Sequence, residues 1–429
     1  MKSIVLTTFG SYGDLHPYLA IALGLKARGH LPIIATSGFY QQKIESAGIQ
    51  FRPVRPNLED VVNDPEVMRS VNHLRTGTEY VVRRIFMPHM RESYEDLSRA
   101  GEGADLLVTH PLTYAGRLVA EKRGMPWLAT VLSPLSFMST EDPPVMAPAP
   151  WLNRLHGLSP SLYRLVFRLM RGITHSWSKP VRALREQVGL PPSSQDPLLE
   201  GQFSPFMNLA LFSPVLARPQ ADWPPNTRVT GFPLYDSDAA AERDGSSVER
   251  FLSAGDPPLV FTLGSSAVFD ARGFFRESAV AAKRLRKRAV LVTGPDPGNR
   301  PSDLLSEDIA AFDYVPHSRI FPRAALNVHQ GGIGTLAQAL RSGRPMLIVP
   351  FSHDQPDNAA RAMKLGIARS IQRFKYSADG VVSELRLLLQ DSSYAKAAAV
   401  VGNAVRQEDG VKAACDAIER YLARTHAPS

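Results

Sequence analysis

The chain has 429 residues, of which 44% are hydrophobic and 21% charged, a composition that excludes an intrinsically disordered protein and favours two packed domains. Its net charge is +8, but the basic residues are dispersed apart from one run at 283–288, and the sequence carries no nucleic-acid-binding motif. We therefore expect no nucleic-acid partner. The run is typical of a solvated helix end, and a peripheral contact with an anionic membrane or an acidic partner remains an alternative.

The chain contains one cysteine, Cys415, which cannot form an internal disulfide bond. No secretion-signal pattern opens the sequence, and no stretch approaches about 18 uninterrupted apolar residues. These features predict a cytoplasmic protein without a membrane-spanning helix.

The first half of the sequence alternates strand and helix patterns. Apolar runs predict strands at 3–9 and 32–37, and residues 14–29 between them have helical spacing. The alternation continues to a strand-like run at 207–213. This pattern predicts a parallel sheet with helices on both faces, and therefore a Rossmann-like domain over residues 1–213.

The segment 133–160 interrupts the alternation and is rich in proline and in large apolar side chains. Long loops in compact domains are often functional, so we expect this one to line a binding pocket. The candidate lining residues are Phe137, Met138, Met146 and Trp151. Packing of the same side chains in an ordinary core is an equally good interpretation.

Residues 214–247 are rich in Pro, Asp and Ser and predict an interdomain linker. Strand and helix patterns then resume, which predicts a second Rossmann-like domain over residues 248–409. The last segment, 410–429, has one apolar helical face that needs a packing partner, and either domain is a candidate. The predicted fold is therefore α/β, with two doubly wound domains in tandem.

The motif HQGGIGT, residues 329–335, follows a predicted strand and precedes a predicted helix. In doubly wound domains, ligands bind at such places because glycines allow close backbone approach and the helix start offers free N–H groups. The motif lacks the lysine of a P-loop and the spacing of a dinucleotide fingerprint. We expect a phosphate site with His329 as a hydrogen-bond donor; the alternative is a histidine that only caps the loop.

Polar residues follow the next predicted strand on the same edge of the sheet, at Asp354, Gln355 and Asn358. Hydrogen-bonding groups of this kind beside a phosphate site suggest a nucleotide sugar as ligand. Ser265 and Ser266, after the first strand of the second domain, are suited to a diphosphate, although a plain turn explains them equally well.

Residues 314–366 and the opening segment TTFGSYGDLHPYLAIALGLKARGH, residues 7–30, resemble the family-one glycosyltransferases with the GT-B fold. Bacterial members that act on sterols, glycopeptides and the lipid precursor of rhamnolipids are the most similar. The resemblance implies two Rossmann-like domains that face each other across a cleft, the first binding the acceptor and the second the nucleotide sugar.

The resemblance implies one donor site in the second domain. Its residues are Ser265, Ser266, Tyr314, Val315, His329, Gly332, Gly334, Thr335, Gln338, Asp354, Gln355 and Asn358. His329 and the glycine-loop amides would hold the diphosphate, Tyr314 and Val315 the base, and Asp354 with its neighbour the sugar hydroxyls. Gln338 stands where relatives often have a ribose-binding glutamate, so a neutral amide replaces a carboxylate here.

Asp14, in the sequence GSYGDLHP, stands where relatives carry the catalytic base. His16 is the reserve candidate, and a plain helix cap is the alternative role for Asp14. The implied reaction is an inverting transfer in which Asp14 deprotonates the acceptor hydroxyl, while His329 and the helix amides stabilise the leaving nucleoside diphosphate. No cluster with metal-ligand spacing lies near the loop, so we expect no metal and no cofactor.

The favoured donor is UDP-glucose, with dTDP-rhamnose as the alternative. The expected acceptor is an apolar small molecule, such as a phenolic, a macrolide, a sterol or a hydroxy-lipid, bound by the pocket residues of the 133–160 segment. A nucleotide-sugar epimerase and a non-catalytic nucleotide-sugar-binding protein are the competing functions. The sequence does not imply an oligomer.

Overall fold

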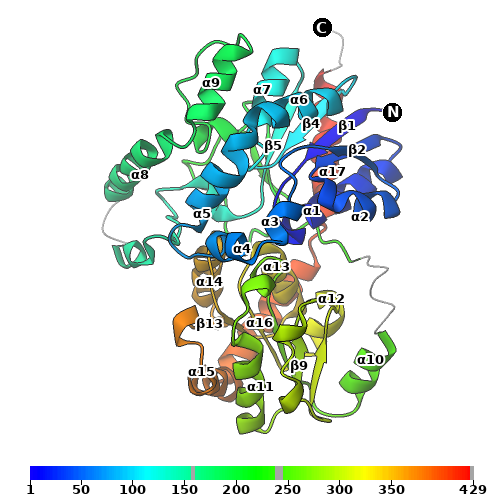
Figure 1. The fold of residues 1–429 in the computed structure, drawn as a ribbon, viewed down its shortest axis with the longest axis vertical. Coiled ribbons are helices and arrows are strands. Elements are labelled where there is room, and N and C mark those ends of the chain that lie inside the picture. Colours follow the sequence, from blue (N-terminus) through cyan, green and yellow to red (C-terminus); the bar gives the residue numbers. More distant parts are fainter. Residues whose placement is uncertain (156–159, 237–244, 426–429) are drawn as a thin grey trace.

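The computed structural model describes residues 1–155, 160–236 and 245–425. Within them, two parallel sheets with helices on both faces form two domains that are stacked along the long axis of the molecule (Figure 1). This arrangement confirms the predicted α/β fold with two Rossmann-like domains.

The first sheet has seven parallel strands in the order β3-β2-β1-β4-β5-β6-β7. The strands are β1 (Ser3–Thr7), β2 (Leu31–Thr36), β3 (Gln50–Pro53), β4 (Leu106–Thr109), β5 (Trp127–Val131), β6 (Asn208–Ala210) and β7 (Thr227–Val229). Apolar residues fill the central strands because helices cover both faces. The strand order reverses between β1 and β4, so a crevice opens at their carboxyl ends.

The second sheet has six parallel strands in the order β10-β9-β8-β11-β12-β13. The strands are β8 (Leu259–Thr262), β9 (Ala289–Val292), β10 (Ile309–Phe312), β11 (Leu326–His329), β12 (Met346–Ile348) and β13 (Ala368–Ser370). Its order reverses between β8 and β11, which places a second crevice at the carboxyl ends of these two strands.

Helices connect the strands of each sheet and cover its faces. In the first domain these are α1 (Tyr12–Ala27), α2 (Gln41–Ser46), α3 (Glu59–Val62), α4 (Pro65–Val71), α5 (Gly77–Tyr80), α6 (Met90–Ala100), α7 (Ala115–Arg123), α8 (Pro160–His175) and α9 (Lys179–Gln187). From the second domain onward they are α10 (Gly245–Ser253), α11 (Phe274–Leu285), α12 (His317–Ile320), α13 (Ile333–Ser342), α14 (Gln355–Lys364), α15 (Ala378–Gln390), α16 (Ser392–Arg406) and α17 (Gly410–Thr425). In the described part of the chain, every helix is too short or too polar to cross a bilayer.

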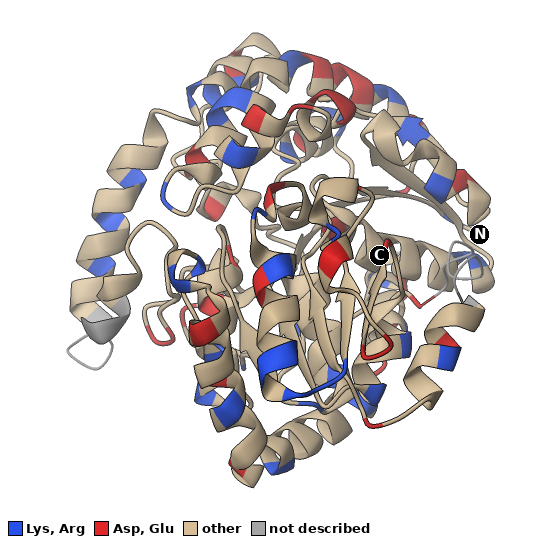
Figure 2. Cartoon of the chain, turned by 60° about the horizontal axis from the view of Figure 1, so that its bottom comes forward, with Lys and Arg blue, Asp and Glu red and all other residues tan. Residues whose placement is uncertain are grey.

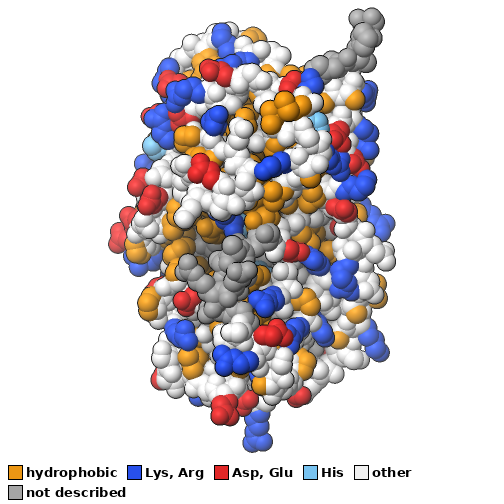
Figure 3. Space-filling view, turned by 90° about the vertical axis from the view of Figure 1, so that its right-hand side faces the viewer, with side chains coloured by type: hydrophobic (Ala, Val, Ile, Leu, Met, Phe, Trp, Pro, Cys, Tyr) orange, Lys and Arg blue, Asp and Glu red, His pale blue; other side chains and the backbone are white. Residues whose placement is uncertain are grey.

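The basic run at 283–288 lies at the end of α11, as predicted. Arg284 pairs with Asp379 at 2.5 Å, and the Arg288 guanidinium stacks over the ring of Phe251. On the face drawn in Figure 3, Lys and Arg side chains are interspersed with Asp and Glu rather than gathered into one patch. Two residues of the run, Arg284 and Arg288, therefore make contacts within the protein.

The first domain extends beyond its predicted end at residue 213. Strand β7 pairs with β6, with Thr227 opposite Asn208, although the sequence assigned residues 214–247 to a linker. The sequence has a strand-like run at 227–232, but the proline-rich composition around it, which is typical of linkers, outweighed that signal. Residues 237–244 of the predicted linker, and residues 426–429 of the predicted final helix, lie outside the described residues.

Helix α17 runs back and packs against α1 of the first domain. The Arg28 guanidinium contacts the carboxylates of Asp416 and Glu419, each at 2.7 Å. A Cβ atom on Gly24 would lie 2.9 Å from Sγ of Cys415, so this close helix approach requires a residue without a side chain. Helix α17 therefore packs on the first domain, a choice that the sequence did not determine.

Shortening one buried side chain of α17 tests this docking. Ile418 is fully buried in the core of the first domain, and we expect Ile418→Ala to lower the free energy of unfolding by about 2–4 kcal/mol because it leaves a cavity. Urea denaturation measures the change. The exposed Arg420 on the same helix provides the control, since Arg420→Ala is expected to cost less than about 0.5 kcal/mol. Equal effects of the two substitutions would contradict the docking.

Candidate active site

The two crevices face each other, and the N-termini of α1 and α13 meet between the domains. A Cβ atom on Gly334 would lie only 3.0 Å from Cα of Gly13, so the two helix ends are in backbone contact. Each helix N-terminus presents free N–H groups and about half a unit of positive charge. Two such ends at one place are suited to a diphosphate.

Asp14 lies in the first turn of α1 and caps that helix. Its Oδ2 accepts hydrogen bonds from the Ser11 backbone N–H at 2.7 Å and from the Ser11 hydroxyl at 3.2 Å. The Ser11 hydroxyl oxygen in turn accepts from the Gly13 N–H, which completes a capping box. The cap that the sequence left as an alternative is therefore present, but it uses Oδ2 and leaves Oδ1 for another partner.

That partner is His110, a residue that the sequence analysis did not single out. Its Nε2 lies 3.4 Å from Oδ1 of Asp14. Its Nδ1 accepts a hydrogen bond from the Leu112 N–H at 3.1 Å, so in the neutral ring the proton resides on Nε2 and faces the carboxylate. His110 follows β4, and only the reversal of strand order beside β1 brings it to Asp14. A single histidine so far along the chain leaves no local sequence signal.

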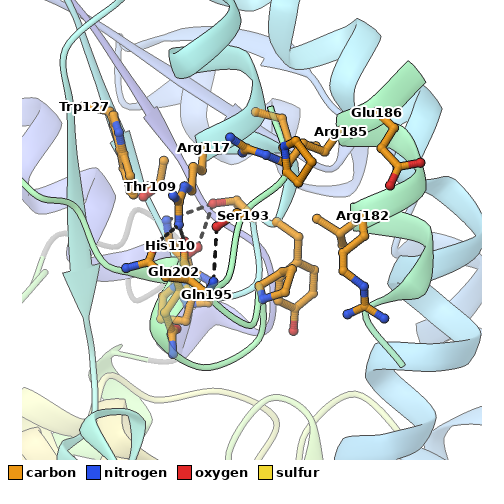
Figure 4. Close-up of a pocket in the computed structure, with 18 residues that line it drawn as sticks. Thr109, His110, Arg117, Trp127, Arg182, Arg185, Glu186, Ser193, Gln195 and Gln202 are labelled. Atoms are coloured by element: carbon orange, nitrogen blue, oxygen red, sulfur yellow. Dashed lines mark hydrogen bonds between the residues drawn. The ribbon is translucent and has the colours of Figure 1, made fainter. Parts of the chain in front are cut away.

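A small cavity lies behind His110, between α7 and α9 (Figure 4). Its volume is about 90 Å³. The indole of Trp127 lines it, and Arg117 donates a hydrogen bond to Oε1 of Gln195 at 2.5 Å beside it. A cavity of this size is below the range of sites that hold drug-sized ligands.

His16, the reserve base, lies away from this pair. Its ring packs near those of Tyr12 and Tyr235, at centroid distances of 5.5 Å and 5.1 Å. Across the cleft it approaches His317: burial, and to a lesser extent the charge of His16, lower the pKa of His317 to about 4. The His16 ring therefore faces the second domain.

His329 ends β11 and is completely buried. Its Nδ1 accepts from the Gly331 N–H at 3.1 Å, so its proton resides on Nε2, and this N–H has no hydrogen-bond partner among the described residues. Burial, together with the neighbouring His317, lowers the pKa of His329 to about 3. The ring is therefore neutral near pH 7 and offers an unused N–H donor beside the glycine loop.

The glycine loop has the geometry expected of a phosphate site. Gly331 has a φ angle of +89°, which favours glycine, and a Cβ atom there would lie 2.7 Å from Cγ2 of Ile348. Gly332 is the N-cap of α13, and Thr335 in the first turn contacts the Gln330 amide at 3.4 Å. The loop thus leads into a helix whose first amides lie at the first domain.

Asp354 and Asn358 form one hydrogen-bonded unit at the start of α14. The Asn358 amide nitrogen donates to Oδ2 of Asp354 at 2.8 Å and to the Gly331 carbonyl at 2.9 Å. Its amide oxygen accepts from the Ser133 hydroxyl of the first domain at 3.3 Å. Burial, with a contribution from the charge of Asp14, raises the pKa of Asp354 to about 7. The two carboxyl groups therefore interact across the cleft.

Three other predicted donor residues are engaged in protein contacts. Oε1 of Gln355 accepts from the backbone N–H groups of Phe351 at 2.7 Å and Ser352 at 3.3 Å. The Ser265 hydroxyl accepts from the Tyr12 N–H at 3.2 Å. Ser266 exchanges hydrogen bonds with the side chain of Asn72 on the first domain, at 3.3 Å and 3.4 Å. In this arrangement the two serines join the domains.

The predicted nucleoside residues lie at the outer end of the same crevice. Tyr314 is 43% exposed, whereas the neighbouring Val315 is buried. The Gln338 amide nitrogen donates to a carboxylate oxygen of Asp236 at 3.1 Å, and Arg341 binds the other oxygen. A glutamate at position 338 would face Asp236 with like charge, which explains why an amide suits this chain.

The four predicted pocket residues of the first domain do not form one surface. Phe137 is buried and stacks on Trp223 at a centroid distance of 4.1 Å, so it packs in the core, the alternative interpretation of the sequence. Met146 is also buried, Met138 is partly exposed, and Trp151 is 61% exposed. Of the four, Trp151 alone presents most of its surface to solvent.

Comparisons with known proteins agree with this geometry. Residues 4–137 match the model of the glycosyltransferase family 28 N-terminal domain, and residues 289–410 match that of the erythromycin biosynthesis protein CIII-like C-terminal domain. The chain is 34% identical to O-mycaminosyltylonolide 6-deoxyallosyltransferase of Streptomyces fradiae over 97% of both proteins. It is 26% identical to sterol 3-beta-glucosyltransferase of Debaryomyces hansenii over 97% of this chain, which spans only 26% of that longer protein.

Solved structures with the same fold support the domain arrangement. The spinosyn forosaminyltransferase SpnP superposes with a TM-score of 0.70 at 16% identity, over 98% of this chain and 99% of that one. The glycosyltransferase VinC, solved in complex with dTDP, superposes with a TM-score of 0.67 at 20% identity, over 98% of this chain and 100% of that one. Both share the GT-B fold with this chain.

The raised pKa of Asp354 predicts a pH-dependent stability. Because the pKa is about 7 in the folded state and 3.8 in a model peptide, the folded protein holds this proton more tightly than the unfolded chain does, and its stability falls as pH rises between these values. We expect Asp354→Asn to raise the Tm relative to the wild type, with a difference that grows from about pH 5 to pH 8. The exposed Asp256 supplies the control Asp256→Asn, whose Tm should follow the wild type; a constant difference for Asp354→Asn would contradict the raised pKa.

Proposed function

This chain belongs to the family-one glycosyltransferases with the GT-B fold, and from that premise we propose that it moves a hexose from a nucleoside diphosphate sugar to a hydroxyl group of an apolar small molecule, with inversion at the anomeric carbon. One observation carries the proposal. A carboxylate oxygen that is not used in the helix cap, Oδ1 of Asp14, lies across the cleft from a phosphate loop with an unused donor, Nε2 of His329.

Asp14 is the general base in this proposal. Its Oδ1 accepts the proton of the acceptor hydroxyl as that oxygen attacks the anomeric carbon and the bond from this carbon to the diphosphate oxygen breaks. The capping box fixes the carboxylate through Oδ2, so the side chain cannot turn away from the cleft without losing two hydrogen bonds. Such fixed orientation is what a base on a single short side chain requires.

His110 is a positioning residue for Asp14. Its Nε2–H faces Oδ1, and the bond from Leu112 to Nδ1 fixes both the ring and its tautomer. His110 therefore orients Oδ1, the reactive oxygen of the carboxylate, while the Ser11 N–H orients Oδ2.

The leaving group is stabilised by hydrogen-bond donors of the second domain. The first amides of α13, after its N-cap Gly332, and the Nε2–H of His329, which has no partner among the described residues, would donate to the diphosphate, and donors fixed before the reaction stabilise developing negative charge effectively. His329 acts as a neutral donor because its pKa is about 3. We infer that these donors stabilise the negative charge on the departing diphosphate, and that no metal ion is needed.

Two donors are candidates. The sequence alone favours UDP-glucose, whereas the similarity to a 6-deoxyallosyltransferase and to a structure in complex with dTDP favours a dTDP-activated 6-deoxyhexose, the class that includes dTDP-rhamnose. We propose a macrolide-like or sterol-like acceptor, since relatives of both kinds match nearly the whole chain.

Mass spectrometry of a reaction mixture tests the proposal. Purified protein in EDTA is incubated with UDP-glucose or dTDP-rhamnose and a panel of macrolide aglycones, sterols and phenolics. We expect a product heavier by one hexosyl or deoxyhexosyl unit with one of the donors. Conversion of the donor to its epimer without transfer would support the competing epimerase, and activity that returns only with added Mg²⁺ would contradict metal independence.

Replacing the base should separate catalysis from binding. We expect Asp14→Asn to lower kcat by about 10²–10⁴-fold, while the Kd for UDP or dTDP, measured by calorimetry, changes little. The asparagine amide oxygen can still accept the hydrogen bond from the Ser11 N–H at the N-cap, so the fold is retained. A matched change in kcat and Kd would show that Asp14 acts in binding rather than as the base.

Replacing His110 should affect kcat more than the KM for the donor. His110→Phe keeps the size of the ring but removes the Nε2–H, and we expect kcat to fall about 10- to 100-fold, whereas His110→Gln, which retains a donor, should recover part of the loss. Equal kcat values for the two variants would contradict the positioning role.

A further inference from the structure

Helix α8 carries a row of exposed apolar side chains on the outer edge of the first domain. Leu165, Leu169 and Ile173 are 50%, 63% and 62% exposed. They are four residues apart, so they lie along one side of the helix. In Figure 1 this helix projects at the left of the first domain, away from both sheets.

The opposite side of α8 is the one that packs on the protein. Tyr163 and Thr174 are buried there, and the Tyr163 hydroxyl donates to the Leu152 carbonyl at 2.8 Å. The exposed row is therefore not the packing face of the helix. An amphipathic helix normally buries its apolar side, and here part of that side stays in solvent.

Basic residues accompany the exposed row. The segment from 143 to 185 contains seven arginine or lysine residues and no aspartate or glutamate. Arg164 and Arg168 are exposed beside the row, and no hydrogen bond or ion pair joins either of them to another residue of the described ranges, whereas Arg171 pairs with Glu200 at 3.2 Å. Figure 2 shows the helix at the left with basic bands and no acidic one.

Another exposed apolar side chain, Trp151 (61% exposed), lies on the other side of this helix. The adjacent Leu152 carbonyl accepts a hydrogen bond from Tyr163 on the packed side of α8, so the indole is not part of the exposed row. We call the exposed row, together with Arg164 and Arg168, the α8 surface.

We propose that the α8 surface docks on an anionic lipid membrane. The leucine and isoleucine side chains enter the boundary between headgroups and acyl chains, while Arg164 and Arg168 contact lipid phosphates. A segment this long without any carboxylate meets no repulsion from a negatively charged surface. Docking there would bring the cleft near a lipid phase in which apolar hydroxylated molecules accumulate.

Cosedimentation with vesicles tests the proposal. The full chain is incubated with vesicles of phosphatidylcholine alone or of phosphatidylcholine mixed with phosphatidylglycerol. We expect binding to the mixed vesicles, which weakens at high salt, and little binding to phosphatidylcholine alone. Equal binding to both kinds of vesicle, or binding to neither, would overturn the proposal.

Two sets of substitutions assign any binding to the α8 surface. Arg164→Gln with Arg168→Gln should weaken binding to the mixed vesicles roughly 10- to 30-fold, and Leu165→Gln with Leu169→Gln should weaken it still further. Both arginines are exposed, so this variant remains folded even where the leucine variant is less stable.

A matched control removes exposed apolar surface elsewhere. Phe374 and Val400 of the second domain are 80% and 70% exposed, and Phe374→Gln with Val400→Gln should leave vesicle binding unchanged. A control variant that loses as much binding as the α8 variants would overturn the assignment. A wild-type protein that is dimeric in solution, and monomeric after the leucine substitutions, would show that a second copy of the chain covers this surface instead.

Discussion

The contact between the N-termini of α1 and α13 is the constraint around which the site is built. Gly13 and Gly334 meet backbone to backbone, and two helix ends with positive partial charge repel each other unless an anion offsets them. Asp14, in the first turn of α1, offsets one of the two ends. Under the proposed function, a bound diphosphate would offset the other, which would link donor binding thermodynamically to the contact between the domains.

A buried ionic cluster fixes a second connection between the domains. Arg361 on α14 contacts Asp357 on the same helix and Asp142 on the first domain, at 2.8 Å and 2.5 Å. Asp357 also accepts from the Val145 N–H at 2.9 Å. Removing one member of such a cluster leaves an uncompensated charge, so the loop of the first domain and the helix that begins beside Asp354 behave as one unit.

Local patterns in the sequence predict the parts of the site that depend on one strand and the helix after it. The glycine loop after β11 and the helix start that carries Asp14 are of this kind, because strand, turn and helix follow one another along the chain; the role of base for Asp14 rests on the family resemblance instead. The contacts of His110 and Gln338 are different. Reversed strand order brings the first to Asp14, and an interdomain segment brings Asp236 to the second, so neither leaves a periodic signal. The same holds for α17, whose apolar face is readable from sequence but whose partner depends on the path of the chain.

The two sides of the cleft differ in how firmly their side chains are held, and this difference bears on specificity. On the donor side, His329 and Asn358 are completely buried and are oriented by hydrogen bonds to the glycine loop. Directional bonds from fixed groups discriminate strongly between ligands because a wrong ligand leaves them unpaired. In the first domain, Trp151 is largely exposed and Met138 partly so, whereas Phe137 and Met146 are buried. Under the proposed function, the fixed groups of the second domain would hold the diphosphate, while the acceptor would vary, as it does between relatives named for a tylonolide derivative and for sterols.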